Sequence, residues 1–483
     1  MPKFVFLWTD LVLWLLAIGT VLYVRHVLRT PTLRATWRHV THSAPAMCSA
    51  VVLLAFMTIA LLDSVHYRPR LPAAGSAGAE SAVAYATRSY SLLDALLIHA
   101  IESREKTYSA PLAYVSLQKE TVIVDGAERR EHPRLAFGGA HLSDPQAQWG
   151  RDVALRSSLG VGAGLLAAAL LAWAVAAWRA RRSAQSVAAS LGEILGGRTD
   201  MPWRPMLATV ALLFACIGAV AALWPAYHPL GTDRTGNDVL YQALKSIRTA
   251  VVIGSLSTVA TLPLAILLGV LAGYFKGWVD DLIQYVYTVL SSIPPVLLIA
   301  ALVLLIQVWI DQNPQWFDTG LERAEFRLFL LCLILGLTGW ATLCRLLRAE
   351  TLKIAQLEYV QAARAFGVSH WQIMRRHILP NVMHLVLIVA VLDFSALVLY
   401  EAVLSYVGVG VDPGSSSFGS MINLARSEMA RDPAVWWNLA SAFVFMLALV
   451  LAANLFADAV REAFDPRARA VRPRRRWLAT PLR

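Results

Sequence analysis

Long apolar runs separated by short polar connections dominate the pattern of residues along the chain. Nine of the runs approach or exceed the roughly 20 residues that a helix needs to cross the hydrocarbon core of a bilayer. Each run therefore predicts a transmembrane helix. With approximate ends, the predicted spans are residues 4–24, 45–63, 157–178, 206–224, 249–274, 282–310, 328–344, 381–405 and 436–460.

The longest connection, residues 64–156, carries the pattern of a small water-soluble module instead. Strands are predicted over residues 113–117 and 121–124, with a turn at Asp125 and Gly126. A helix is predicted from Ser91 to Lys106, with one apolar face made of Leu92, Leu93, Leu96, Leu97, Ala100 and Ile101. The module is an α+β insertion outside the membrane, either a structural cap or a domain that senses a ligand or handles substrate.

Composition supports a polytopic membrane protein. Of 483 residues, 57% are hydrophobic and 16% charged, against about a quarter charged in soluble domains. The four cysteines lie in apolar runs and the histidines are scattered, so no metal site is expected. The net charge of +11 comes from Lys and Arg in short loops and not from a single basic patch interleaved with aromatic residues. We therefore expect that the protein does not bind nucleic acid.

Charge also predicts the orientation. If the N-terminus lies outside, the cytoplasmic segments hold 24 Lys and Arg against 8 Asp and Glu, as the positive-inside rule requires. The C-terminus is then cytoplasmic. The first apolar run has two interpretations, a signal peptide or a retained transmembrane helix. Asp10 interrupts the run, and its charge cluster follows the run instead of preceding it, so we predict a retained helix.

The spans divide into an accessory group and a core. We expect two accessory helices in residues 1–63, the outer insertion in 64–156, and a third accessory helix with a basic linker in 157–202. Residues 203–465 form a core of six transmembrane helices, and 466–483 form a basic cytoplasmic tail. The predicted fold class is an all-α polytopic membrane protein with a small α+β extracytoplasmic insertion.

The most informative connection lies at about residues 358–380 in the cytoplasm. A short helix from Glu358 would end at Gly367, which can take the left-handed conformation of a helix C-terminus. A second helix then leads to Pro380 and the next span. Such an elbow can transmit a push from a cytoplasmic partner into the membrane, although the geometry alone also fits any amphipathic surface helix. The candidate contact residues are Glu358, Tyr359, Gln361, Ala362, Ala363, Arg364, Phe366, Gly367, Leu379 and Pro380.

The spacing in the elbow resembles a known loop. Gly367 follows Ala363 by four residues, and Leu379-Pro380 follows after twelve more. This resembles the "EAA" loop of binding-protein-dependent ABC importer permeases, in the dipeptide, oligopeptide and nickel class. Gln361 stands where that family usually has Glu. Further similar segments are His228 to Asp233, Gly236 to Leu240, Gly273 to Asp280, Glu401 to Gly410 and Asn454 to Arg467, so the resemblance covers about residues 203–470.

The resemblance implies a type I importer core that translocates peptides or a similar solute across a bacterial inner membrane by alternating access. It implies a second homologous permease, two ABC ATPase subunits that dock on the elbow, and an outer solute-binding protein. The chain has no Gly-x4-Gly-Lys-Ser/Thr phosphate loop. We therefore expect a transport subunit and not an enzyme, with no cofactor of its own, and with ATP and Mg bound by the ATPases.

Acidic and kinking residues within the core spans are candidates for the translocation path. Charged groups inside a membrane are costly, which singles out Asp393 and Glu401. Pro294 and Pro295 should kink the sixth predicted span. Each of these four residues also has a purely structural interpretation: Glu401 at the membrane interface, Asp393 hydrogen-bonded to a neighbour, and the two prolines in a bend that lets helices pack. Two other functions stay open at this point: a secondary transporter that uses the two acids as ion sites, and a sensor that uses the outer module.

Overall fold

The computed structural model describes residues 3–464 apart from 71–84, 87, 125–126, 318 and 413. Within this part nine helices are long and apolar enough to cross a membrane, which confirms the predicted number. They are α1 (Trp8–Arg29), α3 (Ala44–Asp63), α6 (Pro145–Ser183), α8 (Trp203–Leu223), α9 (Val239–Phe275), α11 (Pro295–Gln312), α12 (Gly320–Ile354), the α15 segment (Leu379–Tyr406, continuous with the preceding turns) and α17 (Trp437–Phe464).

Shorter elements connect these helices. The helices are α2 (Pro31–His42), α4 (Leu92–Leu96), α5 (Ile98–Glu102), α7 (Val187–Leu195), α10 (Gly277–Ser292), η1 (Pro314–Trp316), α13 (Glu358–Ala365), α14 (His370–Ile373), the π-turn η2 (Met374–Ile378) and α16 (Phe418–Glu428). The strands are β1 (Lys3–Val5), β2 (His66–Arg68), β3 (Tyr90–Ser91), β4 (Glu120–Val124) and β5 (Ala127–Glu131).

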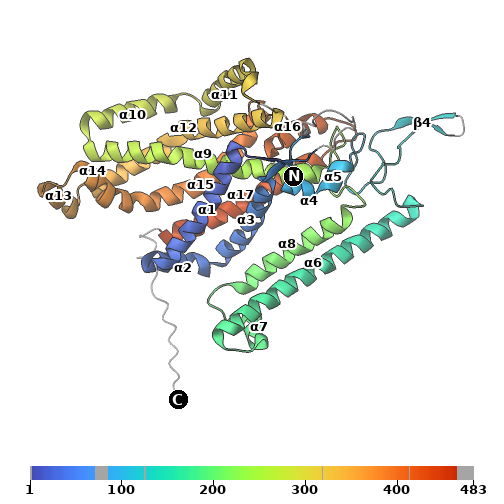
Figure 1. Cartoon of the computed structure of the whole chain (residues 1–483), viewed down its shortest axis with the longest axis horizontal. Helices are drawn as coiled ribbons and strands as arrows, with labels where there is room; N and C mark the ends of the chain where they lie inside the picture. The colour runs from blue at the N-terminus through green and yellow to red at the C-terminus, as the bar shows by residue number, and fades with distance from the viewer. Residues whose placement is uncertain are drawn as a thin grey trace, which may run out of the picture.

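The centre of the molecule is a bundle of α9, α12, α15 and α17, seen side by side in Figure 1. Helix α9 packs along most of the length of α12. Gly269 and Gly273 of α9 lie one turn apart and meet the backbone of α12, where a Cβ would approach within 2.8 Å. Since lipid gives little hydrophobic force between helices, such small residues hold the bundle by close packing.

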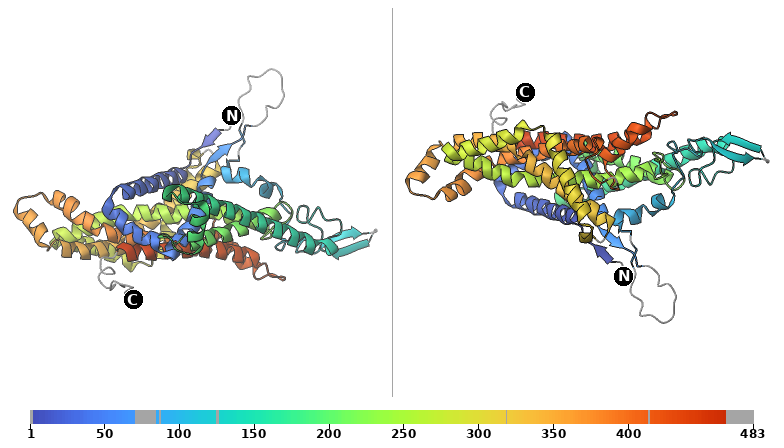
Figure 2. Two further views of the ribbon diagram at one scale, coloured as in Figure 1. Left: turned by 90° about the horizontal axis from the view of Figure 1, so that it is seen from below. Right: turned by 90° about the horizontal axis from the view of Figure 1, so that it is seen from above.

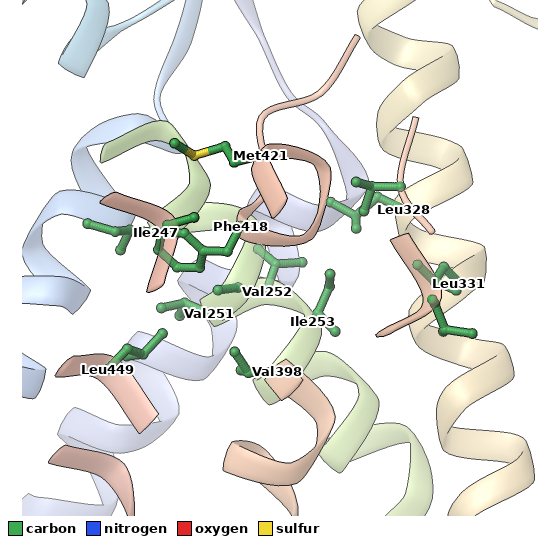
Figure 3. Packing of buried hydrophobic residues seen from close by; sticks show 14 of the residues in the cluster. Ile247, Val251, Val252, Ile253, Leu328, Leu331, Val398, Phe418, Met421 and Leu449 are labelled. Carbon is green, nitrogen blue, oxygen red and sulfur yellow. The ribbon is translucent and has the colours of Figure 1, made fainter. Parts of the chain in front are cut away.

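Apolar side chains fill one half of the bundle. Figure 3 shows α9 at the centre of this cluster, surrounded by side chains of α12, α15, α16 and α17. The labelled residues are Ile247, Val251, Val252, Ile253, Leu328, Leu331, Val398, Phe418, Met421 and Leu449. Helix α16 is a short helix between the last two spans, and the Ser417 capping box starts it.

Helices α6 and α8 form an antiparallel pair that diverges from the bundle in Figure 1, with α7 at its closed end. A Cβ on Gly160 would lie 2.3 Å from the backbone oxygen of Gly218, and one on Gly164 would lie 2.0 Å from that of Phe214. Only glycine permits this approach of two helix backbones. The predicted third accessory helix therefore pairs with the first predicted core helix, and it begins at Pro145, earlier than the predicted residue 157.

The first two accessory helices lie against the bundle. Helix α3 packs on α9 and α17, and α1 packs on α12 and α9. Strand β1, before α1, pairs antiparallel with β2, after α3, and β2 pairs with β3. The start of the chain and the start of the outer module therefore lie at the same end of the molecule.

The outer module differs in detail from its prediction. The predicted helix over residues 91–106 is two short helices, α4 and α5, with a break at Leu97, and Leu96 is 65% exposed. The prediction of a strand over residues 113–117 is wrong, because only Val115 makes an isolated bridge there, with Arg134. The second strand is confirmed as β4, paired with β5, although the predicted turn at Asp125 and Gly126 lies outside the described residues.

Two prolines break the sixth predicted span completely. Helix α10 ends at Ser292, and α11 begins at Pro295 after an extended Ile293. Proline has no amide hydrogen to donate to the preceding turn, so the hydrogen-bond ladder stops there. The predicted kink is thus a junction between two helices, and the chain direction changes there in Figure 1.

Candidate functional site

The elbow after α12 is a helical hairpin that projects from one end of the bundle (Figure 1). Helix α13 ends at Ala365, and Gly367 follows with φ +77°. This is the predicted left-handed residue. The hydroxyl of Ser369 then accepts a hydrogen bond from the amide of Gln372 and caps α14. Through the π-turn η2, α14 continues into α15 with Pro380 in its first turn.

Two polar contacts fix the elbow to the membrane helices. The Tyr274 hydroxyl of α9 lies 2.8 Å from Nδ1 of His370 at the start of α14. The Asn381 amide of α15 donates to the Tyr359 hydroxyl of α13 over 3.1 Å. Below them, Val360, Ile373 and other apolar residues are buried in one cluster with α9, α12 and α15. These contacts connect the elbow directly to α9 and α15.

The outer surface of the elbow is apolar and basic. Phe366 is 87% and Trp371 64% exposed. The structure gathers the predicted contact residues of the elbow on one projection, most of them exposed, with Ala363 and Leu379 half-buried. Aromatic side chains are among the residues that are enriched at protein–protein interfaces.

The candidate path residues lie in different surroundings. Glu401 is 2% exposed and accepts a hydrogen bond from Ser405 one turn along α15, over 2.6 Å. Gly419 of α16 covers its carboxylate, since a Cβ there would lie 2.9 Å from Glu401 Oε1. Asp393, two turns earlier, is half-buried and has no hydrogen-bond partner among the described residues. The single chain therefore encloses Glu401 and leaves Asp393 partly open.

A buried charge cluster, not predicted from the sequence, joins the accessory helices to the core. Arg248 of α9 is 4% exposed. Its Nε lies 3.0 Å from Asp10 of α1, and its Nη1 lies 2.7 Å from Glu325 of α12. Thr9 bonds both Arg248 and Glu325, and His66 Nδ1 lies 2.8 Å from Asp10. These five residues are the Arg248 cluster. The interruption of an apolar run by Asp10 was the one sequence signal for it.

Lys245, one turn before Arg248, makes a second link. Its ammonium lies 2.6 Å from Asp63 at the end of α3 and 3.0 Å from Asp94 in α4. Burial disfavours ionised Asp94, but the Lys245 charge and hydrogen bonds from the Ser91 amide and the Tyr241 hydroxyl outweigh it and lower the pKa of Asp94. Ion pairs thus connect α9 to the accessory helices α1 and α3 and to the outer module.

A third buried group fixes the rest of the outer module at the start of α9. Asp238 caps α9 by accepting from the Tyr241 amide, and its other oxygen lies 2.9 Å from Nδ1 of His228. Nε2 of His228 lies 3.7 Å from Glu105, which also accepts hydrogen bonds from the amides of residues 136–138.

The pKa values of this group favour its ionised form. Burial of His228 lowers its pKa, but Asp238 and Glu105 raise it further, to about 9. Burial raises the pKa of Glu105, but His228 and the three amides bring it down to about 2. Near neutral pH the group is therefore an ionic contact between the outer module and the N-terminus of α9.

Comparison with known proteins identifies the family to which the core is similar. Residues 265–470 match the family model of the binding-protein-dependent transport system inner membrane component. The oligopeptide transport system permease protein OppC of Mycobacterium bovis is 32% identical over 245 residues, 51% of this chain and 78% of that protein. The glutathione transport system permease protein GsiD of Pectobacterium atrosepticum is 30% identical, over 50% and 73% of the two chains.

Two further proteins are similar. The peptidoglycan transport system permease protein YejE of Agrobacterium fabrum is 35% identical, over 49% of this chain and 57% of that protein. A chain of the MetNI methionine ABC transporter in an inward-facing conformation aligns with 47% of this chain and 96% of its own length, at 19% identity and a TM-score of 0.35.

The bundle, the projecting elbow, the family match and the similarity to OppC and GsiD together define a multi-pass membrane permease of an ABC importer. The chain belongs to the family of binding-protein-dependent transport system inner membrane components, in its peptide and nickel class. The expectation from the elbow and its companion segments is confirmed.

Proposed function

We propose that this permease imports peptides or solutes of similar size across a bacterial inner membrane. The relatives named above are permeases of oligopeptide, glutathione and peptidoglycan transport systems, which supports a substrate with peptide bonds. Two ATPase subunits that bind ATP and Mg, a second homologous permease and an outer solute-binding protein complete the transporter. The N-terminus lies outside and the C-terminus in the cytoplasm, where the excess of basic residues in short loops supports that orientation.

In this proposal the elbow is the docking site for an ATPase subunit. The observation that carries it is the combination of an exposed aromatic tip, Phe366, with two contacts that lead inward, Tyr274 to His370 and Asn381 to Tyr359. ATP binding closes the ATPase dimer and moves the elbow. Because α14 runs without a loop into α15, and His370 contacts α9, both helices move with it.

Alternating access then follows from the movement of the bundle. Asp393 stays a candidate for the wall of the path, because it is partly open and lacks a partner among the described residues. Glu401 is a candidate only if α16 moves, since Gly419 covers it in this conformation. The junction at Pro294 and Pro295 supplies a hinge at which α10 can turn relative to α11.

Substitution at the turn of the elbow tests the docking site. Gly367→Pro cannot adopt the φ of +77°, and Ala363→Asp places a charge on the proposed contact surface. Both variants are expected to insert into the membrane but to lose transport and co-purification of the ATPase. Gly408→Pro is the matched control, because Gly408 also has positive φ, at +86°, but lies at the opposite end of α15. Retained ATPase binding in both elbow variants would refute the assignment.

A further inference from the structure

Helix α2 is a short amphipathic helix that connects two candidate membrane spans, α1 and α3. Its 12 residues extend about 18 Å at the usual helical rise. Trp37 and the buried Val40 lie one turn apart and pack on the end of α17, where the Trp37 ring lies 5.6 Å from that of Phe464. The helix is thus held at the end of the bundle nearest the elbow (Figure 1).

The other face of α2 and the end of α1 carry a row of arginines. Arg34 and Arg38 lie one turn apart on α2, and Arg25 and Arg29 lie one turn apart on α1. All four side chains are exposed. We call these four residues the basic row.

Among the described residues, the only acidic side chain paired with the basic row is Asp200. Between Asp10 and Asp63 the sequence contains no Asp or Glu. Within the described part of the chain, Arg25, Arg29 and Arg34 have no side-chain partner. Arg38 reaches Asp200 at 3.8 Å, but that aspartate is 87% exposed, so the pair is weak.

The position of the basic row relative to the membrane indicates what kind of ligand it binds. A helix whose apolar face is buried and whose ends lead directly into membrane spans lies at the level of the lipid headgroups. Trp37 and Tyr23, joined by a 3.2 Å hydrogen bond, are residues that favour this interface. Three guanidinium groups without a carboxylate partner among the described residues, together with the weakly paired Arg38, match phosphate groups at this depth. Arginine binds phosphate with two parallel hydrogen bonds.

We propose that Arg25, Arg29, Arg34 and Arg38 form a binding surface for anionic phospholipid headgroups. The surface sits on accessory helices that lie outside the matched family region, residues 265–470. Because Trp37 and Val40 pack on α17, lipid bound there stabilises the contact between the accessory helices and the core. The proposal requires only that α1 and α3 span the membrane and is independent of the transported solute.

The test is lipid binding by the purified full-length chain. Native mass spectrometry in mild detergent measures the binding of phosphatidylglycerol and of phosphatidylcholine with the same acyl chains. The basic-row variant is Arg25→Gln, Arg29→Gln and Arg34→Gln, three exposed residues whose replacement breaks no hydrogen bond or ion pair among the described residues. The matched control removes three exposed arginines at the opposite end of the molecule, Arg130→Gln, Arg151→Gln and Arg234→Gln. All variants keep the basic sequence after Asp465.

The native chain and the control are expected to bind phosphatidylglycerol selectively, and the basic-row variant to bind it roughly a hundredfold more weakly. Equal binding of the two lipids by the native chain would overturn the proposal, as would an equal loss in the control. If the basic-row variant fails to fold, the native chain still decides the question. Its phosphatidylglycerol binding should fall steeply between low and high salt, and salt-independent binding would count against a headgroup surface.

Discussion

Replacement of Arg248 by methionine is the most informative perturbation of this protein. Methionine keeps a long, flexible side chain but removes the guanidinium that Asp10 and Glu325 share. Both carboxylates then stay buried without a positive partner on α9. The change tests whether the accessory helix α1 is held to the core by charge.

The expected cost follows from the burial of all three groups. Arg248, Asp10 and Glu325 are each exposed by 6% or less. Removing one partner of a buried ion pair costs about 3–5 kcal/mol, because the remaining charge is left desolvated. Neutralising all three residues at once, with Asp10→Asn, Arg248→Met and Glu325→Gln, leaves no buried charge among them. This triple variant should recover most of the loss.

The assay is unfolding of the purified chain by SDS in mixed micelles, followed by far-ultraviolet circular dichroism. The expected order of stability is native chain, triple variant, then Arg248→Met. Arg323→Met is the control, because Arg323 pairs with Asp311 at 2.8 Å but both side chains are more than 40% exposed. That surface pair should contribute no more than about 1 kcal/mol.

Two results would refute this reasoning. If Arg248→Met unfolds at the same SDS fraction as the native chain, charge pairing does not hold α1. If the triple variant is as unstable as Arg248→Met, the loss comes from packing and not from buried charge.

Two further predictions concern other contacts of the accessory parts. The pKa of His228 is about 9 in the folded chain against 6.5 ordinarily, so its stabilising charge is complete below about pH 6.5 and is lost as the pH rises to 9. The thermal midpoint should fall over that range, and His228→Gln should flatten the profile; an unchanged slope would contradict the prediction. Gly160→Leu places a side chain where a Cβ already lies 2.3 Å from Gly218 and should destabilise the α6–α8 pair by about 1–3 kcal/mol in SDS unfolding. Gly162→Leu, which faces open space, should have little effect, and equal losses in both variants would argue against close helix contact.

The spans and the elbow were predictable because their signals are local. A membrane helix needs only a run of apolar residues, so all nine were found without any knowledge of contacts. Gly367 indicated the end of α13 because glycine readily adopts the left-handed conformation that ends many helices. This signal lies in a single residue and needs no distant contact. The assignment of the elbow residues to docking, and of Asp393 and Glu401 to the path, stays a prediction.

The outer module was less predictable because its signals are short and its contacts are distant. The residues from Ser91 to Lys106 favour a helix, but Asp94 turns toward Lys245 and Glu105 toward the amides of residues 136–138. The helix is broken at Leu97, between the residues that make these two contacts. Residues 113–117 have strand propensity but find only one bridge, and strand propensity counts little without a paired neighbour.

Residue patterns along the chain were enough to identify a membrane protein, the number of its predicted spans and the family of its core. Hydropathy and motif spacing are local properties of the sequence and do not depend on contacts between distant residues. The pairing of α6 with α8 became visible in the folded chain, as did the contacts of Arg248 with Asp10 and Glu325, which lie 238 and 77 positions away. The physical reason is that an ion pair or a glycine contact exists only when two distant segments meet, and either residue alone looks like any other charge or glycine.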